Sequence, residues 1–268
     1  AVHGPLLVEL PTIGNGQARL LFPAPGDALL LDPAVERKRV GMRTLTRVAL
    51  APLDFGADGH NLPAGLWPVG TTRKIEQKPA RGVPAYWYAD VLLNWLTTAA
   101  DDSVDESILG QAAIQPDTAT GVEGALFATS GVSFLAQPHA DASLSHTRRF
   151  ALAVRVAEEA TLHAALAPLG GERRLMRWQA FDLPLPQLPP ALVSAIVADK
   201  ACRMVLATPA FFRAGWQPGD LLQTVQGVTV TLRAAAVERA LTISGWGFAD
   251  LRAKPTRRLG AAGSVYYL

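Results

Sequence analysis

Cysteine, long apolar runs and a signal peptide are scarce or absent in this sequence. Among 268 residues there is one cysteine, Cys202, so the chain cannot form an internal disulfide or a cysteine-based zinc site. We expect a buried structural thiol in a reducing compartment. No apolar run reaches the ~18 residues of a membrane-spanning helix, and no signal peptide is visible. These absences favour a cytoplasmic protein without disulfides.

Catalytic signatures are equally sparse. The five histidines are scattered, with no pair at metal-ligand spacing on one helix, and neither a P-loop nor a dinucleotide fingerprint occurs. The acidic cluster at residues 101–106 could bind a metal through oxygen, although a solvated helix end has the same composition. We therefore predict no metal and no cofactor.

The charge balance excludes a histone-like polycation. Charged residues make up 18 % of the chain and the net charge is +2, so any nucleic-acid contact must come from local basic patches. Hydrophobic residues make up 49 %, which is enough for a sizeable core and argues against disorder. The length allows one large domain or two of ordinary size.

The second half of the chain has the more regular pattern. It predicts, in order, a strand, a helix, a strand, a helix and a strand, at Phe150–Val156, Glu158–Leu166, Leu175–Leu183, Pro189–Asp199 and Cys202–Ala207. Gly170 and Gly171 follow the first helix, as glycine does past a helix end. This order indicates an α+β, ferredoxin-like sandwich of the RRM type. Two further strands, Leu222–Ala234 and Val237–Gly245, resemble an appended antiparallel pair.

The first half is broken by prolines into short pieces. It predicts strands at Leu6–Leu10 and Arg19–Phe22 with a hairpin signal between them, and a helix at Ala89–Thr98. A polar loop at about 137–149 marks a soft domain boundary.

The most informative segment is the C-terminal one. Arg252, Lys254, Arg257 and Arg258 occur with no acidic residue between them, before the small-residue turn 260–264 and a strand-like 265–268. Cations neutralise phosphates, glycine lets the backbone approach them, and tyrosine faces stack on bases, so the segment suits a nucleic acid. A charged linker, a hairpin turn and an edge strand would have the same spacing.

Two other basic patches have a similar composition. One spans 37–47, and the other joins Arg73, Lys74, Lys78 and Arg81 to the aromatic run 86–88. Basic residues interleaved with aromatics suit a single strand. In the alternative interpretation Trp87 and one tyrosine belong to the core and the cations are merely solvated.

A catalytic alternative rests on two histidines. His139 and His146 share a loop with Arg148 and Arg149, as the general base of a ribonuclease would require. Solvated loop histidines would look the same.

Blocks along nearly the whole chain resemble a known family. These are Gly4–Leu7, Leu21–Asp27, Thr118–Phe127, Leu169–Arg174, Leu206–Phe212 with Gly215–Pro218, Lys254–Arg258 and Ala262–Tyr267. Together, in this order, they are similar to the third-subunit family of the Cmr effector complex of type III-B CRISPR systems, Cas-five-like members of the RAMP superfamily. One departure is Ile108, which stands where the family usually has arginine.

The resemblance implies a fold and a set of partners. It implies two ferredoxin-like RAMP domains with inserted loops and hairpins, at 1–145 and 146–268, and a native protein that continues beyond Leu268. It implies a non-catalytic, antiviral ribonucleoprotein subunit that grips the five-prime handle of the crRNA. Expected protein partners are the large Cas-ten-type subunit and the backbone RAMP subunits, with target RNA met only indirectly and no membrane.

The residues that we expect at the RNA are Arg73, Lys74, Gly170, Gly171, Arg173, Arg174, Arg213, Trp216, Lys254, Arg257, Arg258, Gly260, Gly263 and Ser264. Two rival hypotheses remain open. One is a RAMP-family endoribonuclease that processes repeat RNA with His139 or His146. The other is a structural bridge between proteins, with interface at Trp95 and at Phe211–Phe212.

Overall fold

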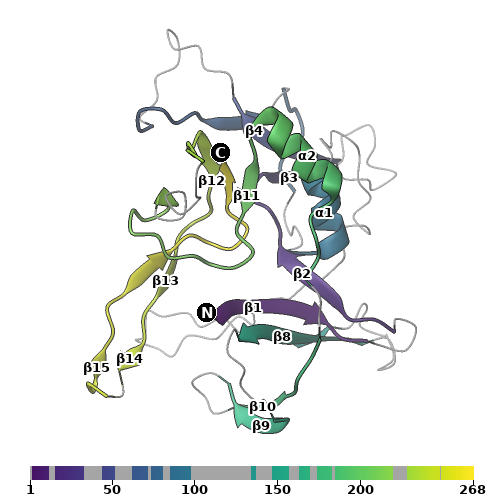
Figure 1. Ribbon diagram of the computed structural model, residues 1–268, viewed down its shortest axis with the longest axis vertical. Helices are drawn as coiled ribbons and strands as arrows, with labels where there is room; N and C mark the ends of the chain where they lie inside the picture. The colour runs from purple at the N-terminus through teal and green to yellow at the C-terminus, as the bar shows by residue number, and fades with distance from the viewer. Residues whose placement is uncertain are drawn as a thin grey trace.

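The computed structural model shows an α+β protein made mostly of small antiparallel sheets (Figure 1). It describes residues 2–11, 16–32, 44–51, 62–71, 74–80, 85–97, 134–136, 147–156, 163–169, 174–182, 185–219, 228–247 and 249–268. Two α-helices lie within these ranges, and neither is long and apolar enough to cross a membrane. The mixed α+β class is confirmed, whereas the two ferredoxin-like domains and their boundary stay predictions.

The largest sheet has five strands in the order β6-β2-β1-β8-β7. Their bounds are Tyr86–Tyr88, Arg19–Pro23, Val2–Glu9, Arg148–Val156 and Leu135–Ala136. The β1–β2 hairpin and β8 confirm the predicted strands, and the helix α1 (Ala89–Thr97) confirms the predicted helix. Because β8 pairs with β1, the start of the predicted second domain shares a sheet with the first.

A second sheet packs its apolar face against α1. It contains β3 (Ala28–Leu31), β4 (Thr44–Leu50) and β5 (Val69–Thr71), in that order. Trp87 and Trp95 meet edge to face beneath it, with ring centroids 5.7 Å apart. Since Trp87 and Tyr88 are both buried, the core interpretation of the aromatic run 86–88 is confirmed.

The C-terminal strand β17 (Val265–Tyr267) is the centre of a third sheet. It lies between β11 (Arg203–Val205) and β12 (Ala234–Ala236), and Tyr266 packs edge to face against Phe212. The edge-strand interpretation of this segment was therefore wrong. The predicted pairing of strands 222–234 and 237–245 was also wrong, because β12 pairs with β17. Hydrophobic alternation predicts a strand but does not identify its partner.

A separate hairpin corrects another prediction. β9 (Ala165–Pro168) pairs with β10 (Leu175–Trp178), so the predicted helix 158–166 does not hold where the residues are described. Helix propensity is a weak prior for so short a run, and cross-strand pairing with β10 outweighs it. The predicted strand 175–183 ends early, at Trp178. The helix α2 (Pro190–Asp199) begins at the predicted proline and ends at Lys200, whose φ of 51° is left-handed.

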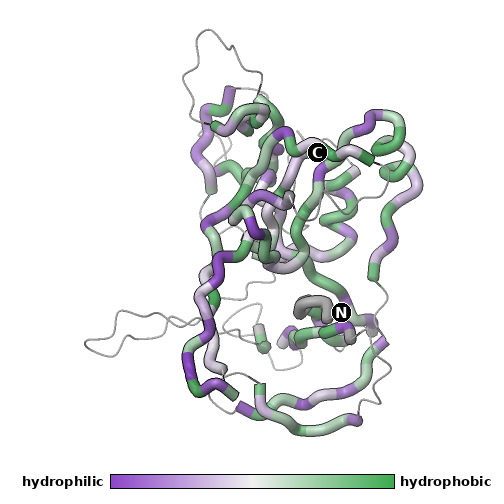
Figure 2. Tube along the Cα trace, turned by 60° about the vertical axis from the view of Figure 1, so that its left-hand side comes forward, coloured by the Kyte–Doolittle hydropathy of each residue, from purple (hydrophilic) through white to green (hydrophobic). Residues whose placement is uncertain are grey.

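A long two-stranded ribbon projects from the third sheet. We call residues 241–259 the arm. It consists of β13 (Leu241–Ile243), β14 (Trp246–Gly247), β15 (Arg252–Ala253) and β16 (Arg257–Leu259). β13 pairs with β16 near the body and β14 pairs with β15 towards the tip. In Figure 1 the arm extends to the lower left, and Figure 2 shows hydrophilic and hydrophobic residues along it.

Candidate nucleic-acid interface

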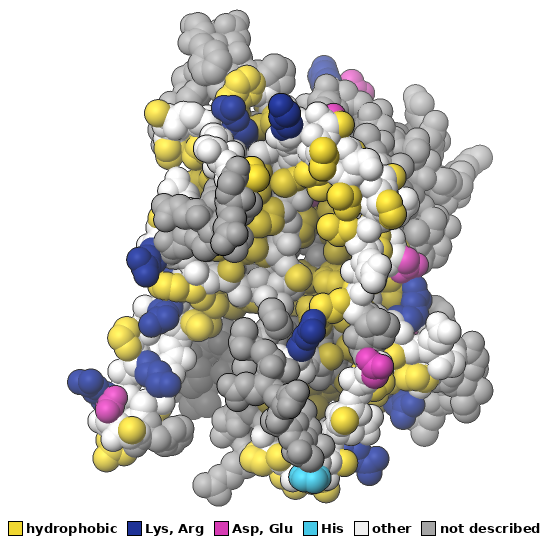
Figure 3. Space-filling view, in the orientation of Figure 1, with side chains coloured by type: hydrophobic (Ala, Val, Ile, Leu, Met, Phe, Trp, Pro, Cys, Tyr) yellow, Lys and Arg dark blue, Asp and Glu magenta, His cyan; other side chains and the backbone are white. Residues whose placement is uncertain are grey.

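The arm concentrates positive charge on its returning strand. Arg252, Lys254, Arg257 and Arg258 are all exposed, and the only carboxylate in the arm sequence is Asp250. Asp250 lies 3.9 Å from Arg252 in a solvent-exposed pair, which is too weak to neutralise the strand. Lysine and arginine side chains are visible along the arm in Figure 3. The predicted basic segment is thus a projecting cationic ribbon.

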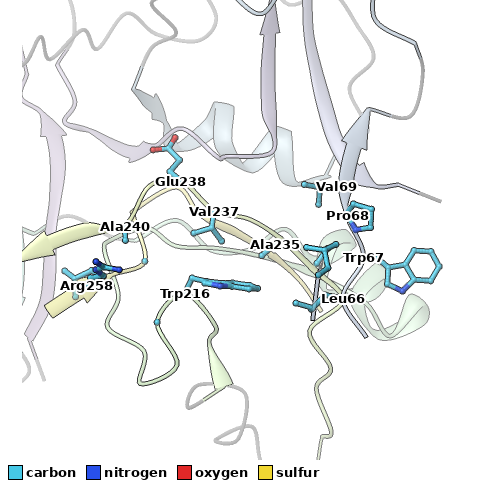
Figure 4. Close-up of a pocket in the computed structure, with 15 residues that line it drawn as sticks. Leu66, Trp67, Pro68, Val69, Trp216, Ala235, Val237, Glu238, Ala240 and Arg258 are labelled. Carbon is cyan, nitrogen blue, oxygen red and sulfur yellow. The ribbon is translucent and has the colours of Figure 1, made fainter. Parts of the chain in front are cut away.

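The base of the arm borders a cavity of about 610 Å³. Arg258 and Ala240 lie at one end, Leu66 and Pro68 at the other, and the Trp216 indole lies between them (Figure 4). The walls are otherwise mainly apolar, and Glu238 turns its carboxylate away from Trp216. The fold thus brings three predicted site residues, Trp216, Arg258 and Gly260, to one cavity.

The C-terminal glycine turn packs against protein. Gly263 and Ser264 are buried, and the Gly26 N–H donates to the Gly263 carbonyl at 2.8 Å. Gly263 has a φ of +87°, and a Cβ there would overlap the carbonyl oxygen of Ala24. Gly260 is also buried, where a Cβ would contact the Tyr266 hydroxyl at 3.2 Å. The turn therefore serves close approach of two chain segments, and its RNA contact stays a prediction.

The two C-terminal tyrosines belong to the core, which corrects the expected base stacking. Tyr266 donates its hydroxyl to the Trp216 carbonyl at 2.8 Å, and Tyr267 donates to the Val48 carbonyl. Burial raises the pKa of both hydroxyls above the ordinary value of about 10. Their ring faces are enclosed by protein and cannot stack on bases.

A buried ionic cluster is centred on Asp27, the residue after Gly26. Asp27 has no exposed surface, and it accepts a hydrogen bond from Trp95 Nε1 at 2.9 Å and one from the Arg203 guanidinium. Arg203 also donates to the Trp95 carbonyl at 3.2 Å, near the end of α1, and Arg47 Nε lies 3.9 Å from Asp27. Burial, followed by repulsion from Arg203, lowers the pKa of Arg47. The cluster joins α1, β4 and β11.

A second ionic cluster lies in the five-stranded sheet. Arg148 Nε donates to the Glu9 carboxylate at 2.8 Å, and Tyr88 donates its hydroxyl to the same carboxylate. The Arg19 guanidinium stacks 3.4 Å from the centroid of the Tyr88 ring. Burial acts to raise the pKa of Glu9, but the hydrogen bonds from Arg148 and Tyr88 outweigh it, and the pKa is lowered. Burial and the Glu9 contact raise the pKa of Tyr88 to about 12.

The other predicted residues are scattered or outside the described ranges. Arg174 is exposed directly before β10, and its carbonyl accepts a hydrogen bond from the Leu169 N–H at 3.0 Å. Lys74 and Arg213 are exposed. The residues outside the described part are Arg73, Gly170, Gly171, Arg173, the cations 37–39, the acidic cluster 101–106, His139 and His146. Within the described residues no group of three metal-ligating side chains occurs.

Sequence reasoning missed two features of this region. The Arg257 guanidinium lies 4.9 Å from the centroid of the Phe211 ring, which is half exposed. Asp27 was not among the predicted functional residues, since a lone aspartate after Pro-Gly is most often a turn residue. Cys202, expected to be buried, is only half-buried, and burial raises the pKa of its thiol.

A comparison with protein families decides the class of this chain. The model of one family, described as CRISPR-associated protein (Cas_Cmr3), matches residues 1–268. The chain belongs to the Cas_Cmr3 family. It is therefore a CRISPR-associated subunit of a Cmr complex, as the sequence resemblance indicated. No match was found among curated proteins.

Proposed function

We propose that this Cas_Cmr3 chain binds crRNA without cutting it. The arm and the cavity at its base hold the single-stranded five-prime handle, and the chain docks on the large Cas-ten-type subunit. The observation that carries the proposal is the projecting ribbon, whose returning strand has four exposed cations and no acidic residue between them. A flexible single strand is bound by neutralising its phosphates and by stacking its bases.

The cavity supplies the second component of such binding. Trp216 is half-buried, in walls that are mainly apolar, beside the exposed Arg258. A base that leaves the stack can lie against an indole while its phosphate meets the arginine, an arrangement worth about 1–3 kcal/mol per base. The arm and the cavity are adjacent, so one strand can engage both.

The test is salt-dependent binding of labelled repeat RNA by the double variant Lys254→Ala with Arg258→Ala. Two lost phosphate contacts should lower the slope of log affinity against log salt by about 1.4, since each contact on a single strand contributes about 0.7. Arg155→Ala with Arg177→Ala removes the same charge from exposed positions on β8 and β10, and should leave the slope near wild type. Equal slopes for the two double variants would refute the arm as the RNA site.

The absence of catalysis is tested separately. Purified chain incubated with labelled repeat RNA should leave it intact over hours, with and without added Mg²⁺. Cleavage that disappears in His146→Ala would instead identify a RAMP-type endoribonuclease.

A further inference from the structure

The arm has two chemically different faces. Successive residues of a strand point to opposite faces, and residues directly opposite each other share a face. In the β13–β16 register Thr242 lies opposite Arg258, and Ile243 lies opposite Arg257. The two adjacent arginines, which sequence treats as one basic patch, therefore point to opposite faces.

One face belongs to the cavity. Arg258 lines that cavity, whereas Arg257, Leu241 and Ile243 do not, although Leu259, which ends β16, also borders it. This face is polar and cationic, with Thr242 and Arg258 as its strand-paired members. We call it the cavity face, and it is the face that the proposed RNA contact uses.

The other face is apolar around a single cation. Leu241 and Ile243 are 47 % and 44 % exposed, and Phe211 beside them is 50 % exposed. Arg257 shares this face and lays its guanidinium over the Phe211 ring, 4.9 Å from the centroid. We call these four residues the apolar face. A partner that covers these side chains removes apolar surface from water, which favours association.

The composition of the apolar face disfavours nucleic acid. Leucine and isoleucine offer no ring on which a base could stack, and one side of the Phe211 ring is covered by Arg257. A phosphate backbone would find Arg257 alone among three large apolar groups, whereas Arg252, Lys254 and Arg258 remain available to it along the same returning strand. A protein surface that brings its own apolar side chains matches this face better.

The charge of Arg257 indicates one further property of that protein. The described residues provide Arg257 with the Phe211 ring and with no ion pair, so its charge is available to a partner. Stacking on a ring face leaves the N–H donors of a guanidinium available to a carboxylate. Arginine and aromatic residues in this combination are typical of interface hot spots.

We propose that the apolar face of the arm, Leu241, Ile243, Phe211 and Arg257, docks another protein subunit of the Cmr complex. The occupant presents apolar side chains together with a carboxylate opposite Arg257. The arm is thereby clamped between RNA on its cavity face and protein on its apolar face. This inference rests on the proposed function only for the RNA side of the clamp.

The test compares two adjacent positions with one substitution. Tagged chain carrying Ile243→Asp or Thr242→Asp is co-expressed with the other subunits of its own Cmr complex and a crRNA, and native mass spectrometry counts the subunits. Ile243→Asp should reduce the occupancy of one protein subunit at least about tenfold, while repeat RNA binding by the isolated chain stays at wild type. Thr242→Asp should do the reverse, weakening RNA binding with every subunit retained.

Phe211→Ser provides a second route to the same face without altering the arm. It should reduce the same subunit as Ile243→Asp, and unchanged circular dichroism and melting temperature confirm folding. Full subunit occupancy in Ile243→Asp and Phe211→Ser would overturn the proposal. So would loss of RNA binding in Ile243→Asp, which would make this face an RNA contact. If the isolated wild-type chain binds no RNA, the proposed function fails, and the subunit counts still decide the docking face.

Discussion

At the scale of single residues, Asp27 is the most deeply buried carboxylate in the described part of the chain. Its carboxylate is fully buried between two arginines and an indole N–H, and these three groups come from β4, β11 and α1. Removing one charge from a buried ionic cluster leaves its partners uncompensated, which costs more than the cluster contributes when it is intact.

Asp27→Asn should therefore lower the free energy of unfolding by about 3–5 kcal/mol. The amide keeps the shape and can still accept from Trp95, but it leaves Arg47 and Arg203 without a counter-charge. Urea denaturation measures the change. Asp250→Asn, which breaks an exposed pair, should stay within about 0.5 kcal/mol of wild type, and an equal loss in both variants would contradict the account.

The lowered pKa of Glu9 predicts how the free energy of unfolding depends on pH in the acid range. Because its pKa is lowered in the folded state, its contribution is complete above the unfolded-state value of 4.5 and is lost as the pH falls through the folded-state value. Wild type should lose stability more steeply below about pH 4.5 than Glu9→Gln does, as measured by denaturation at stepped pH. Parallel pH curves for wild type and Glu9→Gln would contradict the account.

At the scale of elements, the turn 260–264 packs against residues 23–26, which lie far from it in the sequence. Gly263 combines a left-handed backbone with close approach to Ala24, whereas Gly65 has a φ of +84° and open space where a Cβ would lie. Comparing substitutions at these two glycines therefore distinguishes the cost of backbone strain from the cost of steric overlap.

Gly65→Ala should cost about 1 kcal/mol of stability, from backbone strain alone. Gly263→Ala should cost at least about 3 kcal/mol, because the overlap with the Ala24 carbonyl is added to the strain. Chemical denaturation of both variants gives the difference. Similar costs would show that the packing of this turn against residues 23–26 does not contribute.

The elements also show which predictions a sequence can support. The strands around Leu6, Arg19 and Phe150 and the helices from Ala89 and Pro190 were predictable, because hydrophobic period and terminal proline are local signals. The partner of each strand was not, since β12 and β13 pair across long sequence separations with β17 and β16. The faces of Arg257 and Arg258 likewise depend on register, which no single strand encodes.

At the scale of the whole molecule, charge is distributed unevenly. The arm carries four cations and one carboxylate, whereas the complete chain has a net charge of only +2. The remainder of the chain is thus close to neutral, so the arm is a local concentration of positive charge that attracts a phosphate backbone. This distribution supports the proposed function, in which RNA binds at the arm and the other surfaces are left for protein.

The interface residues of the bridging hypothesis can now be placed. Trp95 and Phe212 are buried and cannot form an interface, whereas Phe211 is half exposed beside the arm. The proposed protein docking and the proposed RNA binding therefore involve the same element.

Site-specific cross-linking tests the central claim most directly. A Cmr complex assembled on crRNA with 4-thiouridine in its five-prime handle is irradiated, digested and analysed by mass spectrometry. The account predicts cross-links from the handle to the returning strand of the arm, residues 252–258, and to the cavity around Trp216. Cross-links of this chain that fall only outside the arm and the cavity, in a fully assembled complex, would contradict it.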